Sequence, residues 1–157
     1  MVTSLLCHIV CSHGNDDQIN EYILLMQKVN DAFNSHDSAE LMKYMTNDVI
    51  FSQSTSKNPL NELRIEGSDK VKEAFDNTFL NFPDAKWIRR GQDAVFMSGS
   101  EYKGLSEWTF VGTRKSDNAF FNVDGLDIFT FKNGKIYFKD AYRKDVPGIV
   151  PFTPQDL

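Results

Sequence analysis

Apolar side chains recur every three or four residues along three segments, a spacing typical of helices with one buried face. The first segment spans about 16–34. A short second helix is predicted after Asp37, which stands three residues before Glu40 as in a capping box. The third is predicted from Ser68 to the Phe82-Pro83-Asp84 break. The predicted buried positions are Ile19, Tyr22, Ile23, Met26, Val29 and Phe33, then Leu41, Met42 and Met45, then Val71, Ala74, Phe75 and Phe79.

The rest of the chain is predicted to form strands, because its β-rich runs are bounded by turn residues. Helices followed by an antiparallel meander are typical of an α+β fold, with the helices packed on one face of the sheet. We expect a single domain over 15–144, preceded by an N-terminal extension at 1–14 and followed by a Pro-containing tail at 145–157. The predicted strands are 48–53, 63–66, 86–98, 102–114, 120–131 and 136–143.

The dipeptide Asn133-Gly134 is a strong hairpin signal between two of these strands. A two-residue turn there sets Lys132 opposite Lys135, and side chains then alternate between the two faces of the ribbon. Counting outward predicts that one face carries Phe131 opposite Ile136, Phe129 opposite Phe138, and Asp127 opposite Asp140.

Two facing aspartates on an otherwise apolar face suggest acid–base chemistry. In such a pair the Cα atoms lie about 4.5 Å apart, and the like charges repel more strongly in a low-dielectric pocket. We therefore expect Asp127 and Asp140 to share one proton near neutral pH, so that one carboxyl donates a hydrogen bond while the other acts as a base. The alternative is that both are solvated, or paired with Arg143, Arg114 or Lys103.

Composition narrows the classes of partner. The chain has 157 residues, a net charge of -5 and interspersed charges, which argues against nucleic-acid and anionic-membrane partners. No apolar run reaches the roughly 18 residues of a membrane span. The 13 Phe residues suit both a core and the wall of an apolar ligand pocket. We expect a cytoplasmic protein that binds a small apolar ligand, with no nucleic-acid or membrane partner.

The two cysteines both lie near the N-terminus, so no disulfide framework is expected. Cys7, His8, Cys11 and His13 do not have the spacing of a zinc site, and we predict no metal and no cofactor. The first eleven residues contain no Lys or Arg, which favours an N-terminal extension over a secretory signal.

Several stretches together resemble one protein family. They are NSHD at 34–37, NDVIF at 47–51, EWTFVGT at 107–113, VDGLDIFTF at 123–131, NGKI at 133–136 and DAYRK at 140–144. This pattern resembles the SnoaL-like proteins of the nuclear transport factor 2-like superfamily, together with ketosteroid isomerase and limonene-epoxide hydrolase. The resemblance implies a cone-shaped, cystatin-like fold, with three helices on a strongly curved mixed sheet around an apolar pocket. It also implies a homodimer formed through the outer sheet face, to which Leu126, Ile128 and Tyr137 are suited.

The resemblance carries catalytic roles over only in part. Asp127 falls where ketosteroid isomerase has the protonated aspartic acid of its oxyanion hole, and Asp140 falls near the acid–base aspartate of SnoaL-type cyclases. The isomerase's general base falls at Gln53 and its tyrosine at Val29, so its mechanism is not expected here. The arginine and second aspartate of the epoxide hydrolase are not found around Trp108.

Other side chains are candidates for ligand binding, each with a structural alternative. Gln53 could bind a ligand carbonyl, or water and backbone could satisfy its amide. Trp108 could be a pocket wall or ordinary core, and Tyr142 could place its hydroxyl at the pocket mouth. The full set of predicted ligand-binding residues is Gln53, Phe51, Trp108, Phe129, Phe138 and Tyr142.

The sequence thus leads to a hypothesis of a cofactor-free isomerase, cyclase or lyase that acts on an apolar, carbonyl-bearing compound such as a polyketide- or steroid-like molecule. Asp140 would transfer the proton, and Asp127 would stabilise the enolate oxygen. The alternatives are a non-catalytic module that binds a hydrophobic ligand or assembles as a dimer, and an epoxide hydrolase.

Overall fold

The computed structural model describes residues 13–54 and 63–144, with side chains described over 16–53 and 63–144. The predicted tail, both cysteines and residues 1–12 of the predicted extension lie outside these residues. The first helix begins at His13, within the predicted extension. The helices are α1 (His13–Asn34), α2 (Ser38–Lys43) and α3 (Ser68–Asn81). The strands are β1 (Met45–Ser54), β2 (Leu63–Glu66), β3 (Lys86–Arg89), β4 (Ala94–Ser98), β5 (Glu101–Thr113), β6 (Phe120–Lys132) and β7 (Lys135–Arg143).

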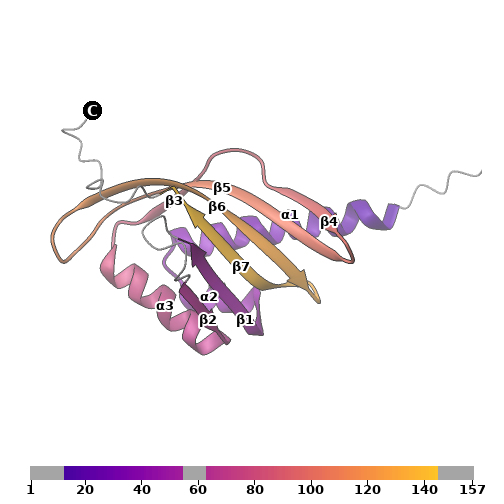
Figure 1. Cartoon of the computed structure of the whole chain (residues 1–157), viewed down its shortest axis with the longest axis horizontal. Coiled ribbons are helices and arrows are strands. Elements are labelled where there is room, and N and C mark those ends of the chain that lie inside the picture. Colours follow the sequence, from indigo (N-terminus) through magenta and orange to yellow (C-terminus); the bar gives the residue numbers. More distant parts are fainter. Residues whose placement is uncertain (1–12, 55–62, 145–157) are drawn as a thin grey trace, which may run out of the picture.

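One mixed sheet contains all seven described strands. Its order is β2-β1-β7-β6-β5-β3, and β4 also pairs with β5. Among the described pairs only β1 and β7 run parallel. The chain passes from β2 through α3 to β3 at the opposite edge of the sheet and then returns by antiparallel strands to β7. Figure 1 shows a strongly curved sheet with the helices on its concave side. The predicted α+β, cystatin-like architecture is confirmed.

The helices form where the apolar spacing predicts them. The carboxylate of Asp37 accepts a hydrogen bond from the backbone N–H of Glu40 at 2.8 Å, as the capping box requires. Met45, predicted on the second helix, instead begins β1. The core lies between the helices and the concave sheet face, and its most deeply buried hydrophobic residues are Val29, Leu41, Met45, Val49, Val71 and Ile136.

The single strand predicted at 86–98 is wrong, because this stretch forms two strands. Both β3 and β4 pair with β5, and the register shifts by two residues between them. Local contacts stabilise the interruption: the backbone N–H of Arg90 donates to the carbonyl of Glu107 at 2.9 Å. The guanidinium of Arg89 contacts the carboxylate of Asp93 at 2.8 Å. Apolar alternation alone does not reveal such a break.

The Asn133-Gly134 turn forms as predicted, but the register beyond it does not. Both turn residues have positive φ, 53° and 74°, and Lys132 lies opposite Lys135. A β-bulge at Tyr137 then adds one residue to β7, so that Thr130 pairs with Phe138.

The bulge overturns the predicted pairing of the two aspartates. Asp127 pairs with Ala141, and Asp140 pairs with Ile128. Likewise Phe129 lies opposite Lys139 rather than Phe138. Because side chains alternate between the faces of a strand, a slip of one residue exchanges the inner and outer sets of β7 beyond the bulge.

In the part of the chain that the structure describes, none of the helices combines the length and the apolar character needed to cross a membrane.

Candidate functional site

A buried ion pair lies on the concave face of the β6–β7 hairpin. The Nζ of Lys139 is 2.6 Å from Oδ1 of Asp127. The two residues are only 5% and 6% exposed. The bulge at Tyr137 creates this pair, because it turns Lys139 inward beside Phe129. Charges removed from water are costly unless they are paired, so each of these side chains depends on the other.

Three aromatic rings surround the ammonium group of Lys139. Its Nζ lies 5.7 Å from the ring centroid of Phe33 on α1, 5.3 Å from that of Phe51 on β1 and 5.8 Å from that of Phe129 on β6. Ring faces carry negative charge density that attracts a cation at such distances. The cation is therefore held by one carboxylate and three rings drawn from distant parts of the chain.

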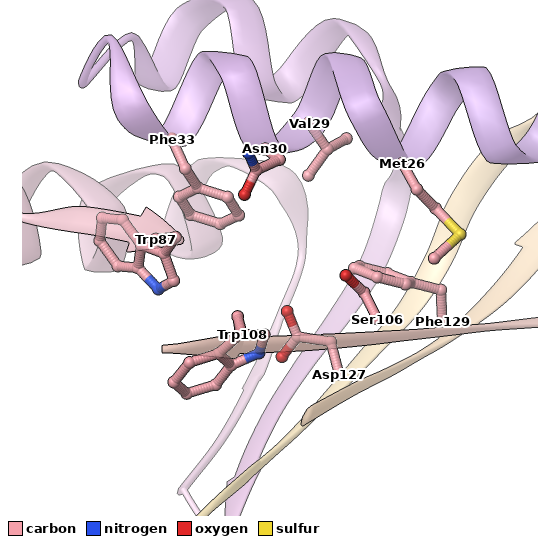
Figure 2. A pocket seen from close by; sticks show the side chains of 9 residues that line it. All are labelled: Met26, Val29, Asn30, Phe33, Trp87, Ser106, Trp108, Asp127 and Phe129. Carbon is pink, nitrogen blue, oxygen red and sulfur yellow. The ribbon is translucent and has the colours of Figure 1, made fainter. Parts of the chain in front are cut away.

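A small cavity of about 20 Å³ opens beside the ion pair. Figure 2 shows the carboxylate of Asp127 pointing into it, below the side chains of α1. This volume admits roughly one water-sized molecule. Its walls combine apolar and polar groups, and the lining residues are Met26, Val29, Asn30, Phe33, Trp87, Ser106, Trp108, Asp127 and Phe129.

The indole of Trp108 supplies a donor at this cavity. Trp108 is 6% exposed, and among the described residues its Nε1 has no hydrogen-bond partner. In Figure 2 the indole nitrogen lies on the side of the ring nearest Asp127. Oδ1 of Asp127 also lacks a partner of hydrogen-bond geometry in the described structure, although the Lys139 ammonium contacts it. A buried donor without an acceptor is uncommon and costly, so we expect a water molecule or a ligand atom in the cavity to accept from it.

Gly125 fixes the position of the Trp108 ring. The two residues are directly opposite on β6 and β5. A Cβ at Gly125 would lie 2.4 Å from the ring and 2.6 Å from the carbonyl oxygen of Tyr142. Only glycine therefore lets the indole lie flat against β6.

A second ion pair lies next to Trp108. Arg89 is opposite Trp108 on β3 and contacts Asp93, whose side chain is 2% exposed. Neither residue lines the cavity that contains Asp127.

Asp140 lies on the opposite sheet face from Asp127. Its carboxylate accepts hydrogen bonds from Ser52 Oγ at 2.9 Å and from the Tyr142 hydroxyl at 2.7 Å. Tyr142 is 41% exposed. Phe138 shares this face, where the Arg64 guanidinium lies 5.7 Å from its ring centroid. The predicted site residues beyond the bulge are therefore directed away from the cavity: Asp140, Tyr142 and Phe138.

The structure brings together part of the predicted ligand-binding set. Trp108 and Phe129 line the cavity, and Phe51 reaches the same site through Lys139. Gln53 is partly buried on the same face of β1 as Phe51, but it does not line the cavity.

Sequence reasoning missed Lys139, Asn30, Ser106 and Trp87 as site residues. Lys139 was hidden by the bulge, since regular alternation places it on the outer face. Ser106 carries a weak signal, because it is a small polar residue on an inward position of β5, directly opposite Asp127. Among the described residues, no three His, Cys, Asp or Glu side chains are grouped as a metal site would require.

Comparison with known proteins identifies the family. The model of the SnoaL-like domain matches residues 26–138. No curated protein sequence matches the chain. Among solved structures, the fold is similar to a candidate SnoaL-like polyketide cyclase from Jannaschia sp. CCS1, with TM-score 0.65, 12% identity and coverage of 80% of this chain and 87% of the other.

Two further structures are similar at the level of the fold. A candidate isomerase from Bacillus subtilis has TM-score 0.66 and 11% identity, covering 80% of this chain and 87% of the other. An NTF2-like protein of unknown function from Mesorhizobium loti has TM-score 0.63 and 18% identity, covering 82% of this chain and 95% of the other.

Proposed function

Because this chain belongs to the SnoaL-like domain family, we propose that it is a cofactor-free enzyme of the isomerase, cyclase or lyase type that acts next to the carbonyl group of an apolar compound. The relatives described as a polyketide cyclase and an isomerase favour this class of reaction. The observation that carries the proposal is a buried carboxylate, Asp127, in the same small cavity as the indole N–H of Trp108, which has no acceptor among the described residues.

The chemistry follows from these two groups. The Asp127 carboxylate takes a proton from the carbon next to the carbonyl, acting as a general base. The indole N–H of Trp108 donates a hydrogen bond to the carbonyl oxygen, where negative charge develops as the enolate forms. The proton then returns to another carbon in an isomerisation, or the enolate carbon forms a new bond in a cyclisation.

This mechanism replaces the one based on two aspartates. That version required Asp127 and Asp140 to face each other, and the bulge places them on opposite faces of the sheet. Asp140 instead accepts hydrogen bonds from Ser52 and Tyr142 there. The cation beside Asp127 is Lys139, which compensates its charge.

The size of the cavity limits how a substrate binds. A volume of about 20 Å³ has room for one water-sized group, such as the oxygen end of a carbonyl, rather than for a fused ring system. In our proposal the reactive end enters the cavity, while the apolar remainder of a polyketide-like substrate contacts the rings around its mouth.

The proposal is tested by hydrogen–deuterium exchange at carbon. A panel of cyclic ketones and β-diketones is incubated with the protein in deuterated water, and exchange next to the carbonyl is followed by proton NMR. The wild-type chain should accelerate exchange for at least one compound. Trp108→Phe should lower that rate by about 10²–10³-fold, as for loss of an oxyanion donor. The matched variant Trp87→Phe, on the other side of the cavity, should retain it. No acceleration with any compound would contradict the proposal.

A binding or assembly module is the second candidate, and the small cavity favours it. Ligand pockets for drug-sized molecules usually measure about 300–1,000 Å³, far more than the volume beside Asp127. In that case apolar compounds would bind, measured by calorimetry, without any exchange. An epoxide hydrolase is less favoured, because the charged pair beside Trp108, Arg89 with Asp93, does not line the cavity with Asp127.

A further inference from the structure

We propose that the cavity beside Asp127 binds one neutral oxygen that both accepts and donates a hydrogen bond. Water fills this position in the free protein, and the hydroxyl of an enol, alcohol or phenol displaces it in the complex. The inference rests on the proposed function for its reaction, and it names the class of group that the site recognises.

Four polar side chains from three elements line this space, which admits about one water molecule. Ser106 and Trp108 come from β5, where a spacing of two residues directs both side chains to one face. Asp127 lies directly opposite Ser106 on β6, and Figure 2 shows Asn30 above them on α1. Empty cavities in proteins are apolar, whereas a polar cavity of this size holds an ordered water with about three hydrogen bonds.

The charges around the cavity select a neutral ligand. Asp127 is the only charged residue among those that line the cavity in the described structure. Its carboxylate lies 2.6 Å from the ammonium nitrogen of Lys139, so the pair has no net charge. A cation or an anion in the cavity would add a third charge removed from water, and this charge would have no partner.

The hydrogen-bonding groups then select a hydroxyl. The indole N–H of Trp108 only donates, and it has no acceptor among the described residues. The ionised carboxylate of Asp127 only accepts. A ligand oxygen that contacts both groups therefore has to accept one hydrogen bond and donate another. Water and hydroxyl groups do both, whereas the oxygen of a ketone or an ether offers no donor to the carboxylate.

The enol is the form of the substrate that meets both conditions. In the proposed reaction, Asp127 takes a proton from the carbon next to the carbonyl, and the electron pair of that C–H bond moves onto the oxygen as the enolate forms. Asp127 then gives the same proton to the enolate oxygen. The resulting enol accepts a hydrogen bond from Trp108 and donates one to Asp127, and no further reactant is consumed.

Matched pairs of hydroxyl compounds and their methyl ethers test the proposal on the full wild-type chain. The probes are cyclohexanol, benzyl alcohol and phenol with their ethers, and cyclohexanone as a compound that only accepts. The chain contains two tryptophans, so isotopic labelling of the indole nitrogens gives two N–H signals in the NMR spectrum, and Trp87→Phe assigns that of Trp108. The shift of this signal during titration yields the dissociation constants.

At least one hydroxyl compound should bind about tenfold or more tightly than its ether and than cyclohexanone, because a buried acceptor left without a donor is costly. Before any probe is added, the Trp108 N–H should show a nuclear Overhauser effect to a long-lived water, which the probe then displaces. Asp140→Asn, on the opposite sheet face, should keep the preference for the hydroxyl, and Asp127→Asn should reduce it.

The wild-type titrations decide the proposal even if a variant does not fold. Ethers or cyclohexanone that bind as tightly as the hydroxyl compounds would overturn it. So would a Trp108 signal that shifts with none of the hydroxyl probes, or an unchanged preference in folded Asp127→Asn.

The titrations also separate this inference from the proposed function. If hydroxyl compounds bind with the stated preference but the protein accelerates carbon exchange in no ketone of the panel, the acid–base function is wrong and the hydroxyl site stands. If carbon exchange is accelerated while cyclohexanone binds as tightly as cyclohexanol, the hydroxyl site is wrong and the acid–base function stands.

Discussion

Lys139 and Asp127 are each stabilised mainly by the other, and this makes the pair sensitive to single substitutions. Lys139→Met leaves a carboxylate buried without its cation, which should lower the free energy of unfolding by about 3–5 kcal/mol. Urea unfolding followed by circular dichroism measures this. The double variant Asp127→Leu/Lys139→Met removes both charges and should be more stable than Lys139→Met alone. If the losses of unfolding free energy in Asp127→Leu and Lys139→Met alone add up to the loss in the double variant, the two residues are not coupled.

The same pair shows what the sequence could predict at single positions. Asp127 was identified as a buried, inward-facing acid, because its parity with Phe129 and Phe131 follows from β6 alone. Its partner Lys139 was not identified, because the side chains that lie beside Asp127 depend on the register of β7 as well. The amide of Gln53 and the hydroxyl of Tyr142 were both placed at the pocket by parity, yet neither lines the cavity.

Gly125 tests the packing between β5 and β6. Adding a Cβ there forces either the Trp108 ring or the Tyr142 carbonyl to move, since both lie within 2.6 Å of the new atom. Gly125→Ala should therefore destabilise the fold by about 1–3 kcal/mol, as overpacking does. Gly91→Ala is the matched control, because nothing lies within 4 Å of its Cβ. Equal thermal melting of the two variants would contradict the packing described here.

Asp84 makes stability depend on pH at the end of β5. The backbone N–H of Thr113 donates to its carboxylate at 2.7 Å, and this hydrogen bond lowers the pKa of Asp84 below the ordinary value. A carboxyl with a lower pKa in the folded state contributes stability above its unfolded pKa, about 3.9, and loses it as pH falls through the folded pKa.

The difference in unfolding free energy between wild type and Asp84→Asn should consequently be larger at pH 7 than below pH 3. Urea titrations at the two pH values measure it. A difference that does not change with pH would contradict the role of this hydrogen bond.

The β6–β7 hairpin marks the limit of sequence reasoning about elements. Its turn is encoded locally, because only residues that tolerate positive φ suit positions 133 and 134. The bulge at Tyr137 has no such local signal. β1 pairs with the other edge of β7 and is itself irregular between Met45 and Ile50. The register of β7 is therefore decided by both neighbouring strands, beyond what one hairpin sequence specifies.

The whole molecule was predicted more accurately than its site. The order of helices and strands and the family resemblance over about 15–144 together indicated the curved α+β fold. Site chemistry depends instead on which side chains share one cavity, and a single added residue changed that set. The fold thus survives local irregularities that alter the chemistry.

We expect the chain to form a homodimer through the outer face of its sheet. Ile88 lies on this face and is 53% exposed, so a charge at this position would lie in the proposed interface. Ile88→Lys should shift the mass measured by light scattering from dimer to monomer. Leu24→Lys on α1, a residue 55% exposed, should leave the dimer intact. A wild-type chain that is monomeric at micromolar concentration would contradict this expectation.

The most direct test of the site compares Asp127→Asn with Asp140→Asn in the carbon-exchange assay. The two acids lie on neighbouring strands but on opposite faces of the sheet. The structure predicts that Asp127→Asn abolishes exchange, whereas Asp140→Asn retains it. Loss of exchange in Asp140→Asn with full activity in Asp127→Asn would contradict the assignment of the cavity beside Lys139 as the active site.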